Sequence, residues 1–287
     1  MQSVCKAVGN RMRSPQVSRT IRTPDGVSIA MQEWGYASGP EIVLIHGFSQ
    51  CHLCWKKQIE SELAEAFRMV TYDLRGHGDS GKPLEAIYYQ ESSRWGQELH
   101  SVINEAHLQR PVIVGWSYGG RVICDYLLSY GDDSIAGINF VDAMTNASPE
   151  WNAPRRELIS AMATAGPSEN TERTLAFLRA CTALPVTPED LDSMLAFNMR
   201  TPVEVRSHMS GRPTPYDDAL RKLSVPVLVT HGEKDQIVLP AVGHYTASDA
   251  PKAEASFYPE AGHMPFWEDA ARFNSELAAF VIKATKA

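Results

Sequence analysis

The chain has 287 residues, which is enough for one large domain with an insertion but marginal for two independent domains. Hydrophobic residues make up 44% of the chain and charged residues 21%, a balance typical of globular proteins, so wholesale disorder is excluded. The formal net charge of −7 disfavours a nucleic-acid partner, because nucleic-acid-binding domains carry basic surfaces.

The N-terminal region and the cysteines bear on the compartment. Residues 1–15 lack the apolar core of a secretory signal, and we expect them to form a flexible tail. No run of about 18 apolar residues occurs, so no membrane span is predicted. The five cysteines are odd in number and scattered, which gives no disulfide framework and fits a reducing compartment. We therefore expect a cytoplasmic protein.

Short apolar and β-branched runs alternate along the chain with longer segments of helical spacing. The expected strands, in chain order, are residues 20–22, 27–32, 41–45, 67–73, 111–115, 135–141, 225–230 and 253–258. The first two flank the turn signal Pro24-Asp25-Gly26 and form a hairpin. The expected helices are residues 54–67, 90–107, 119–130, 240–246 and 266–283. This alternation predicts an α/β fold, with a mostly parallel eight-stranded sheet covered by helices on both faces.

The stretch from residue 143 to residue 218 breaks this rhythm. It contains no convincing strand and is predicted to form several short helices, so we interpret it as a helical cap inserted into a core of residues 16–142 and 219–287. Methionines at helical spacing usually pack in a core, but some of those on an inserted lid should line an apolar substrate pocket. We expect Met144 to be one of them.

Gly115-Trp116-Ser117-Tyr118-Gly119 matches the G-x-S-x-G nucleophile motif. It lies directly after a predicted buried strand and directly before a predicted helix, which is the context that the motif needs. The turn is tight enough to strain the serine backbone, and flanking glycines avoid clashes with the neighbouring strand and helix. Ser117 is therefore predicted to be a nucleophile at a helix N-terminus.

A serine hydroxyl needs a base to remove its proton, and the base needs an acid that fixes its tautomer. His263 follows the last predicted strand and is the expected base, with His231 as its nearest competitor. Asp235, in the loop after residues 225–230, is the expected acid. Asp142 and Glu233 remain alternative acids.

Five motifs in this order resemble the α/β-hydrolase superfamily, closest to its branch of lid-bearing serine esterases, lactonases and cofactor-free haloperoxidase-like enzymes. The motifs are Ile45-His46-Gly47-Phe48, Asp73-Leu74-Arg75-Gly76-His77-Gly78-Asp79-Ser80, Gly115-Trp116-Ser117-Tyr118-Gly119-Gly120, Gly232-Glu233-Lys234-Asp235 and Gly262-His263. The resemblance implies an α/β-hydrolase fold and an oxyanion hole formed by the backbone N–H groups of Phe48 and Tyr118. It implies neither a metal nor an organic cofactor.

The identity of the nucleophile narrows the expected reaction. Haloalkane dehalogenases and epoxide hydrolases of this superfamily use aspartate where this chain has Ser117, so those reactions are disfavoured. Tyr118 replaces the methionine that is usual in haloperoxidase-like relatives, which puts a peroxidase-like side activity in doubt. We expect cleavage of a small or medium carboxylic ester or lactone through an acyl-serine, with the substrate against Phe48, Trp116 and Met144.

Two alternatives stay open at this stage. A carbon–carbon bond hydrolase would use the same triad. From another class, a ligand receptor that retains only slow hydrolysis would keep the same fold.

Overall fold

The computed structural model describes residues 14–146, 153–163, 166–213 and 215–286. Of the predicted tail, residues 1–15, all but Ser14 and Pro15 lie outside the described residues. No helix in the described ranges is both long and apolar enough to cross a membrane.

The sheet has eight strands and is mostly parallel, as predicted. The strands are β1 (Val17–Arg22), β2 (Ser28–Gly35), β3 (Glu41–Ile45), β4 (Arg68–Tyr72), β5 (Val112–Trp116), β6 (Gly137–Val141), β7 (Val227–Gly232) and β8 (Ala253–Tyr258). Their spatial order is β1-β2-β4-β3-β5-β6-β7-β8. The pairs β1–β2 and β2–β4 are antiparallel, and every other pair is parallel. The leading hairpin therefore supplies the antiparallel edge.

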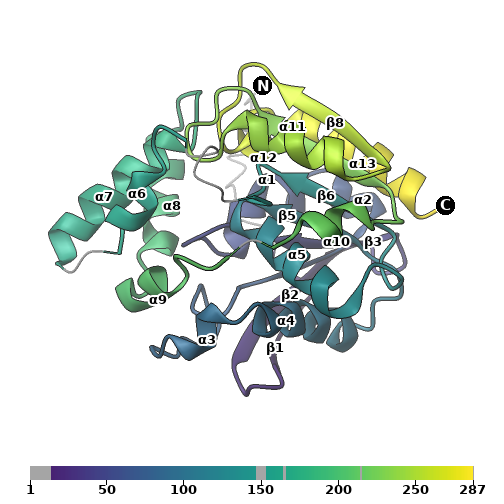
Figure 1. Ribbon diagram of the computed structural model, residues 1–287, viewed down its shortest axis with the longest axis horizontal. Helices are drawn as coiled ribbons and strands as arrows, with labels where there is room; N and C mark the ends of the chain where they lie inside the picture. Colours follow the sequence, from purple (N-terminus) through teal and green to yellow (C-terminus); the bar gives the residue numbers. More distant parts are fainter. Residues whose placement is uncertain (1–13, 147–152, 164–165, 214, 287) are drawn as a thin grey trace, which may run out of the picture.

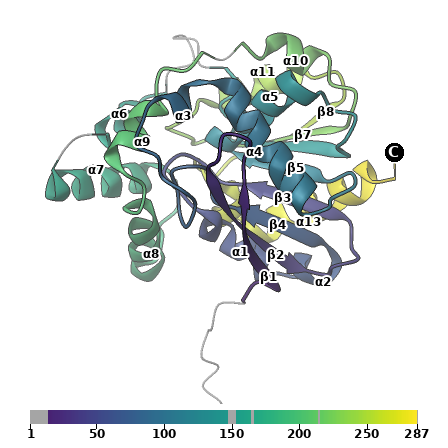
Figure 2. The same cartoon turned by 90° about the horizontal axis from the view of Figure 1, so that it is seen from below.

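The central strands are buried along their whole length because helices cover the sheet on both sides. One face carries α4 (Ser92–Glu105), α5 (Tyr118–Tyr130), α10 (Asp217–Arg221) and α11 (Pro240–Asp249) (Figure 2). The other face carries α1 (Lys56–Ile59), α2 (Leu63–Ala66), α12 (Pro265–Glu268) and α13 (Ala270–Ala284). A short α3 (Ile87–Gln90), which the sequence patterns did not predict, precedes α4.

Two of the predicted helices are broken. The segment predicted as one helix over residues 54–67 forms a 3₁₀ turn (His52–Trp55) followed by α1 and α2. The break lies at Ser61, whose hydroxyl donates to the carbonyl of Gln58 and accepts from the N–H of Leu63. The predicted C-terminal helix is interrupted at Asp269, whose side chain caps α13 by accepting from the N–H of Arg272. Both breaks follow from polar side chains that bond to the backbone in place of helical partners.

Between β6 and β7 the regular elements among the described residues are all helices. They are α6 (Glu157–Ala161), α7 (Pro167–Ala180), α8 (Pro188–Asn198), α9 (Val203–His208) and α10. Helices α6 to α9 form a group at one side of the sheet (Figure 1). The predicted cap boundary between residues 218 and 219 runs through α10, which packs against α5 and α11 of the core.

Candidate active site

Ser117 lies between β5 and α5 in a strained backbone conformation, with φ 54° and ψ −113°. Its N–H donates to the carbonyl of Val141 over 2.9 Å, so the turn is fastened to the end of β6. A Cβ on Gly119 would lie 2.6 Å from the carbonyl oxygen of Ile45, and one on Gly115 would lie 2.6 Å from Ile123 Cδ1. Glycine at position 119 thus lets α5 approach the end of β3, and glycine at position 115 lets β5 approach α5.

His263 and Asp235 are brought together by the loops after β8 and β7. His263 Nδ1 lies 2.6 Å from Asp235 Oδ2, and both side chains are buried. Asp235 Oδ1 accepts from the N–H groups of Ile237 at 2.7 Å and Val238 at 3.0 Å, which fixes the carboxylate. Burial raises the pKa of Asp235, but the charges and hydrogen bonds of His263 and His231 outweigh it and hold the pKa below its usual range. Asp235 is therefore ionised.

Two hydrogen bonds to its backbone hold His263 in position. Its N–H donates to the carbonyl of Cys181 over 2.8 Å. Its carbonyl accepts from the indole N–H of Trp116, the residue before Ser117, over 2.7 Å. The other ring nitrogen, Nε2, is buried and has no hydrogen-bond partner among the described residues. An imidazole held in this way has one nitrogen committed to a carboxylate and one available for a reacting group.

The two predicted oxyanion donors lie in backbone positions that leave an N–H available. Phe48 follows β3, and its N–H makes no hydrogen bond within the part of the chain that the structure describes. Tyr118 is the first residue of α5, where an N–H has no acceptor inside the helix. Both residues line the same pocket as Ser117.

Two buried histidines hold the loop that carries Phe48. His77 Nε2 accepts from the N–H of Ser49 at 3.1 Å, and His46 Nε2 accepts from the N–H of Leu74 at 2.9 Å. Burial lowers the pKa of His46 to about 4 and that of His77 to about 3, so both rings are neutral and can accept. These histidines act on the loop and not on a substrate.

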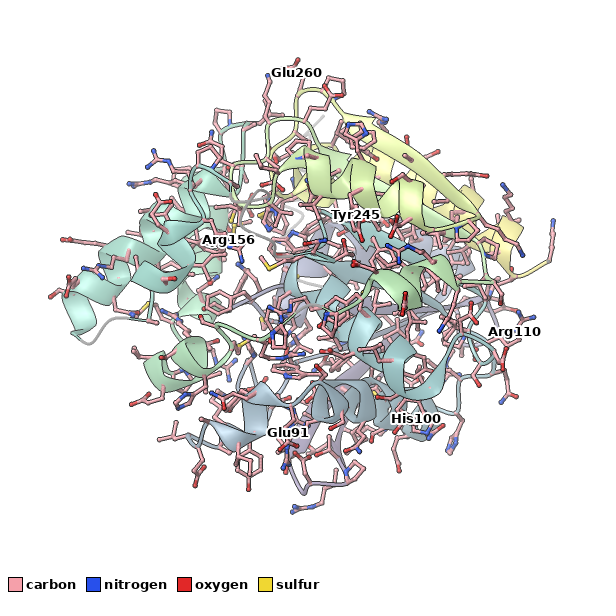
Figure 3. All side chains as sticks on the ribbon, in the orientation of Figure 1. Glu91, His100, Arg110, Arg156, Tyr245 and Glu260 are labelled. Atoms are coloured by element: carbon pink, nitrogen blue, oxygen red, sulfur yellow. The ribbon has the colours of Figure 1, made fainter. Side chains whose placement is uncertain are left out.

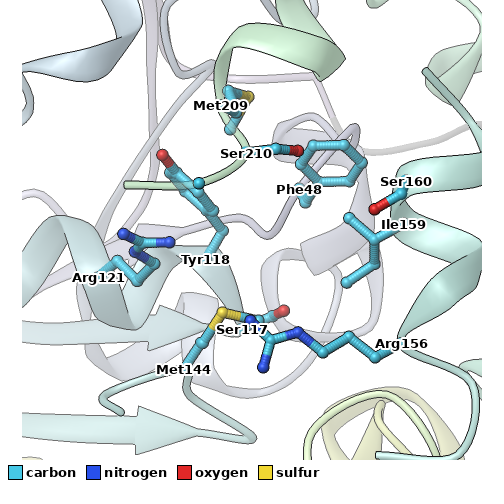
Figure 4. Close-up of a pocket in the computed structure, with 11 residues that line it drawn as sticks. Phe48, Ser117, Tyr118, Arg121, Met144, Arg156, Ile159, Ser160, Met209 and Ser210 are labelled. Carbon is cyan, nitrogen blue, oxygen red and sulfur yellow. The ribbon is translucent and has the colours of Figure 1, made fainter. Parts of the chain in front are cut away.

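Ser117 opens into a pocket of about 130 Å³ (Figure 4). The core contributes Phe48, Ser117, Tyr118, Arg121 and Met144, and the inserted segment contributes Arg156, Ile159, Ser160, Met209, Ser210 and Gly211. The expected substrate contacts Phe48 and Met144 thus line the pocket. Trp116 is not among the lining residues: it packs behind the site, with its ring 5.5 Å from that of His263.

The sequence interpretation missed several polar residues around this site. Arg121 could have been found, because a residue four positions after Ser117 in a helix lies on the same face. Arg156 precedes α6 and carried no motif signal. His231 was considered only as a rival base. It is buried, and its Nε2 atom lies 3.3 Å from Asp235 and 3.7 Å from Asp142.

Two clusters among the described residues place three potential metal ligands within 4.8 Å of one another: Cys51, His52 and Asp73, and Asp142, His231 and Asp235. In the first cluster, the Asp73 carboxylate accepts from the backbone N–H of His52 and contacts its ring nitrogen. In the second, Asp235 is bonded to His263. Because the carboxylates are already engaged within the protein, we assign neither cluster to a metal.

Comparison with known proteins agrees with the fold. A family model described as the alpha/beta hydrolase family matches residues 42–276. An esterase structure from Rhodococcus sp. ECU1013 is 32% identical with a TM-score of 0.86, covering 92% of this chain and 98% of its own. A proposed aryl esterase from Burkholderia cenocepacia is 34% identical with a TM-score of 0.91, covering 94% and 100%.

A bifunctional esterase/perhydrolase from Acinetobacter calcoaceticus is 25% identical over 288 residues, covering 91% of this chain and 98% of its own. The match of the family model extends from β3 to α13 and so includes every loop that carries a predicted site residue. The chain therefore belongs to the alpha/beta hydrolase family.

Proposed function

We propose that this hydrolase cleaves a small or medium carboxylic ester or lactone through an acyl intermediate on Ser117. The observation that carries the proposal is the 2.6 Å contact between His263 and Asp235, with the second ring nitrogen of His263 buried and unpartnered within the described ranges. The esterase names of the two solved relatives and of the Acinetobacter protein support the same class of reaction.

The proposed reaction has two halves. In the first, His263 Nε2 takes the Ser117 proton, and the serine oxygen attacks the ester carbonyl. The N–H groups of Phe48 and Tyr118 stabilise the resulting oxyanion, each contributing roughly 3–4 kcal/mol at the barrier. His263 then protonates the departing alcohol. In the second half, His263 takes a proton from a water molecule, which attacks the acyl carbonyl. The acid is released as His263 returns that proton to the Ser117 oxygen. Asp235 stabilises the imidazolium in both halves.

We also propose that α6 to α9 act as a cap over the site. Ile159, Ser160, Met209 and Ser210 come from this segment and line the pocket opposite Ser117 (Figure 4). The chain's choice among substrates then depends on residues of the insertion, while the chemistry depends on the core. A pocket of about 130 Å³ favours short acyl groups.

Turnover of p-nitrophenyl esters from acetate to decanoate tests the proposal. We expect steady wild-type turnover with a preference for the short acyl groups. We expect a loss of about 10³-fold or more in Ser117→Ala and His263→Ala. Activity in Ser117→Ala equal to that of the wild type would rule out Ser117 as the nucleophile. A single stoichiometric burst without further turnover would favour the receptor alternative.

Covalent labelling separates Ser117 from the other hydroxyls of the pocket. Diethyl p-nitrophenyl phosphate should add one diethylphosphoryl group to the wild type, as measured by intact mass. The adduct should be absent in Ser117→Ala and retained in Ser160→Ala and Ser210→Ala, whose hydroxyls line the same pocket. Labelling lost in either control variant instead would show that another serine reacts.

A further inference from the structure

The pocket beside Ser117 has walls from distant parts of the chain. Tyr118, at the start of α5, forms part of one wall, and residues 209–211 of the insertion form part of another. Figure 4 shows Met209 and Ser210 on the chain segment that passes beside Tyr118, and Figure 3 shows the side chains that fill the region between the α6–α9 helices and the sheet. The distance between these two walls limits the size of the group that can enter.

Arg212 follows the second wall directly and reaches back to α5. Its buried side chain donates from Nη1 to the hydroxyl of Tyr118 over 2.9 Å, and its Nη2 atom forms an ion pair with the buried carboxylate of Asp125. Nη2 also lies 3.2 Å from the hydroxyl of Ser92 on α4. Asp125 accepts in addition from the hydroxyl of Tyr216 at 2.8 Å. A buried arginine with this set of charge-assisted hydrogen bonds is held in one geometry.

Arg121 binds the same segment from the opposite direction. It lies on α5, is buried, and donates from Nη2 to the carbonyls of Arg212 at 2.8 Å and Pro213 at 3.0 Å. The core thus holds the backbone of the insertion through Arg121, and the insertion holds side chains of the core through Arg212. Among the described residues, the hydrogen bonds that join residues 209–213 to the core all involve one of these two arginines.

The ring of Tyr118 is held as firmly as its hydroxyl. Trp95 packs against it edge-on, with the ring centroids 5.2 Å apart. The guanidinium carbons of Arg121 and Arg212 lie 5.3 Å and 5.9 Å from the centroid of the same ring, within the range of cation–π attraction. The residue next to the proposed nucleophile is therefore fixed from the side of the insertion as well as from the core.

We propose that Arg212 is a positioning residue that sets the width of the pocket, and with it the length of the acyl group that Ser117 accepts. This inference rests on the proposed function. Gly211 separates Arg212 from the lining residue Ser210, and no described atom would lie within 4 Å of a Cβ at that position. The wall therefore depends on the bonds made at Arg212. Without them, residues 209–211 can move away from the core and admit longer acyl groups.

The test compares kcat/KM for p-nitrophenyl octanoate and p-nitrophenyl acetate. Arg212→Met removes the anchor, and Arg212→Met combined with Asp125→Asn also avoids leaving a buried carboxylate without its cation. Tyr118→Phe removes only the hydroxyl that Arg212 binds. Arg75→Met is the matched control, because Arg75 is also buried and ion-paired with the buried Glu98 but does not line the pocket. A general loss of stability lowers kcat/KM for both esters by the same factor.

We expect the octanoate-to-acetate ratio to rise by about tenfold in both proteins that lack Arg212, and by about threefold in Tyr118→Phe. The ratio should keep its wild-type value in Arg75→Met. A wild-type ratio in both Arg212 variants would overturn the proposal. So would an equal rise in Arg75→Met, since that would trace the change to lost stability.

A binding measurement keeps this inference separate from the proposed function. Calorimetry of 2-pentanone and 2-octanone with Ser117→Ala, alone and combined with Arg212→Met, needs no turnover. A shift in relative affinity of about tenfold toward 2-octanone on loss of Arg212 supports the proposal even when no ester is cleaved. Turnover of both esters with the same ester and ketone preferences in every variant would keep the esterase and remove this role of Arg212.

Discussion

His231 Nε2 lies 3.3 Å from Oδ2 of Asp235, the same carboxylate oxygen that lies 2.6 Å from Nδ1 of His263. Oδ1 of Asp142 lies 3.7 Å from His231 Nε2 on the other side, and all four side chains are buried. Burial lowers the pKa of His231, but Asp142 and Asp235 outweigh it and raise the pKa to about 9. At neutral pH a buried imidazolium thus shares the carboxylate of Asp235 with His263.

We expect His231→Gln to change the pH dependence of ester hydrolysis. The charge on His231 opposes a second positive charge on His263, because both rings depend on Asp235. Without that charge, the acid limb of the kcat/KM profile should move to higher pH. The control is His244→Gln, an exposed histidine on α11. An acid limb in the same place for His231→Gln and the wild type would contradict this role.

The same histidine should make stability depend on pH. Its pKa is 6.5 in the unfolded chain and about 9 in the fold, so its contribution is complete below pH 6.5 and is lost as pH rises toward 9. The loss should be roughly 2–3 kcal/mol in the free energy of unfolding. Asp142 acts in the same direction, since burial raises its pKa to about 7. Urea denaturation at pH 6, 7.5 and 9 should show this decline in the wild type and a smaller one in His231→Gln.

Asp235→Asn and Asp142→Asn should differ strongly in activity. An amide in place of the Asp235 carboxylate would favour the wrong His263 tautomer, so kcat should fall by about 10⁴-fold. Asp142 bonds to the N–H of Gly232 and contacts His231 but makes no hydrogen bond to His263, so its amide variant should lose about tenfold or less. Steady-state kinetics on p-nitrophenyl acetate measures both. Equal losses in the two variants would mean that Asp142 contributes to the acid function as much as Asp235.

Gly232→Ala should uncouple the two loops that carry Asp235 and His263, the proposed acid and base. A Cβ at this position would lie 1.9 Å from the carbonyl oxygen of Gly262 and 2.5 Å from that of Ala261. Both are backbone atoms, so the loop of His263 must move, and we expect a loss of about 10²-fold or more in kcat/KM. Gly131→Ala is the control: its φ of 68° also strains an alanine, but nothing lies within 4 Å of the added Cβ. Similar activity losses in the two variants would mean that general destabilisation is responsible.

Glu268→Gln should weaken the attachment of the His263 loop. Glu268 Oε1 accepts from the N–H of Gly262 at 2.8 Å, and Oε2 accepts from Ala183 at 2.7 Å and Leu184 at 2.8 Å. An amide keeps only one oxygen, so at least one of these N–H groups loses its acceptor. We expect kcat/KM to fall by about tenfold, with Glu260→Gln, an exposed side chain, as the control. Unchanged kinetics in Glu268→Gln would show that the loop is held without this carboxylate.

The core of the fold could be predicted because its signals are local. Ile42-Val43-Leu44-Ile45 and Val112–Trp116 are short apolar runs without interruption, which is typical of a strand covered on both faces. Ser117, Asp235 and His263 each follow a predicted strand. Because parallel strands end at the same edge of the sheet, the sequence predicts that the three residues lie near one another.

The rest depended on contacts between distant segments. Ser61 ends a helix only because its hydroxyl finds backbone partners there, and the apolar spacing around it gave no sign of this. Arg156 and Met209 lie 53 positions apart in a segment without motifs, and tertiary packing brings them to one pocket. His231 was a rival of His263 because it ends a predicted strand just before Gly232, and that position gave no sign of its contacts with Asp142 and Asp235.

The carbonyl of Cys181 and the N–H groups of Ala183 and Leu184, all from the segment between α7 and α8, bond to the loop and helix around His263. The insertion is therefore not a module that can be exchanged freely between enzymes of this family. A transplanted insertion without these three backbone groups would leave His263, the proposed base, poorly aligned even if its pocket suited the new substrate. Recombination of specificity in this scaffold should succeed when the crossover points preserve residues 181–184 and vary the remainder.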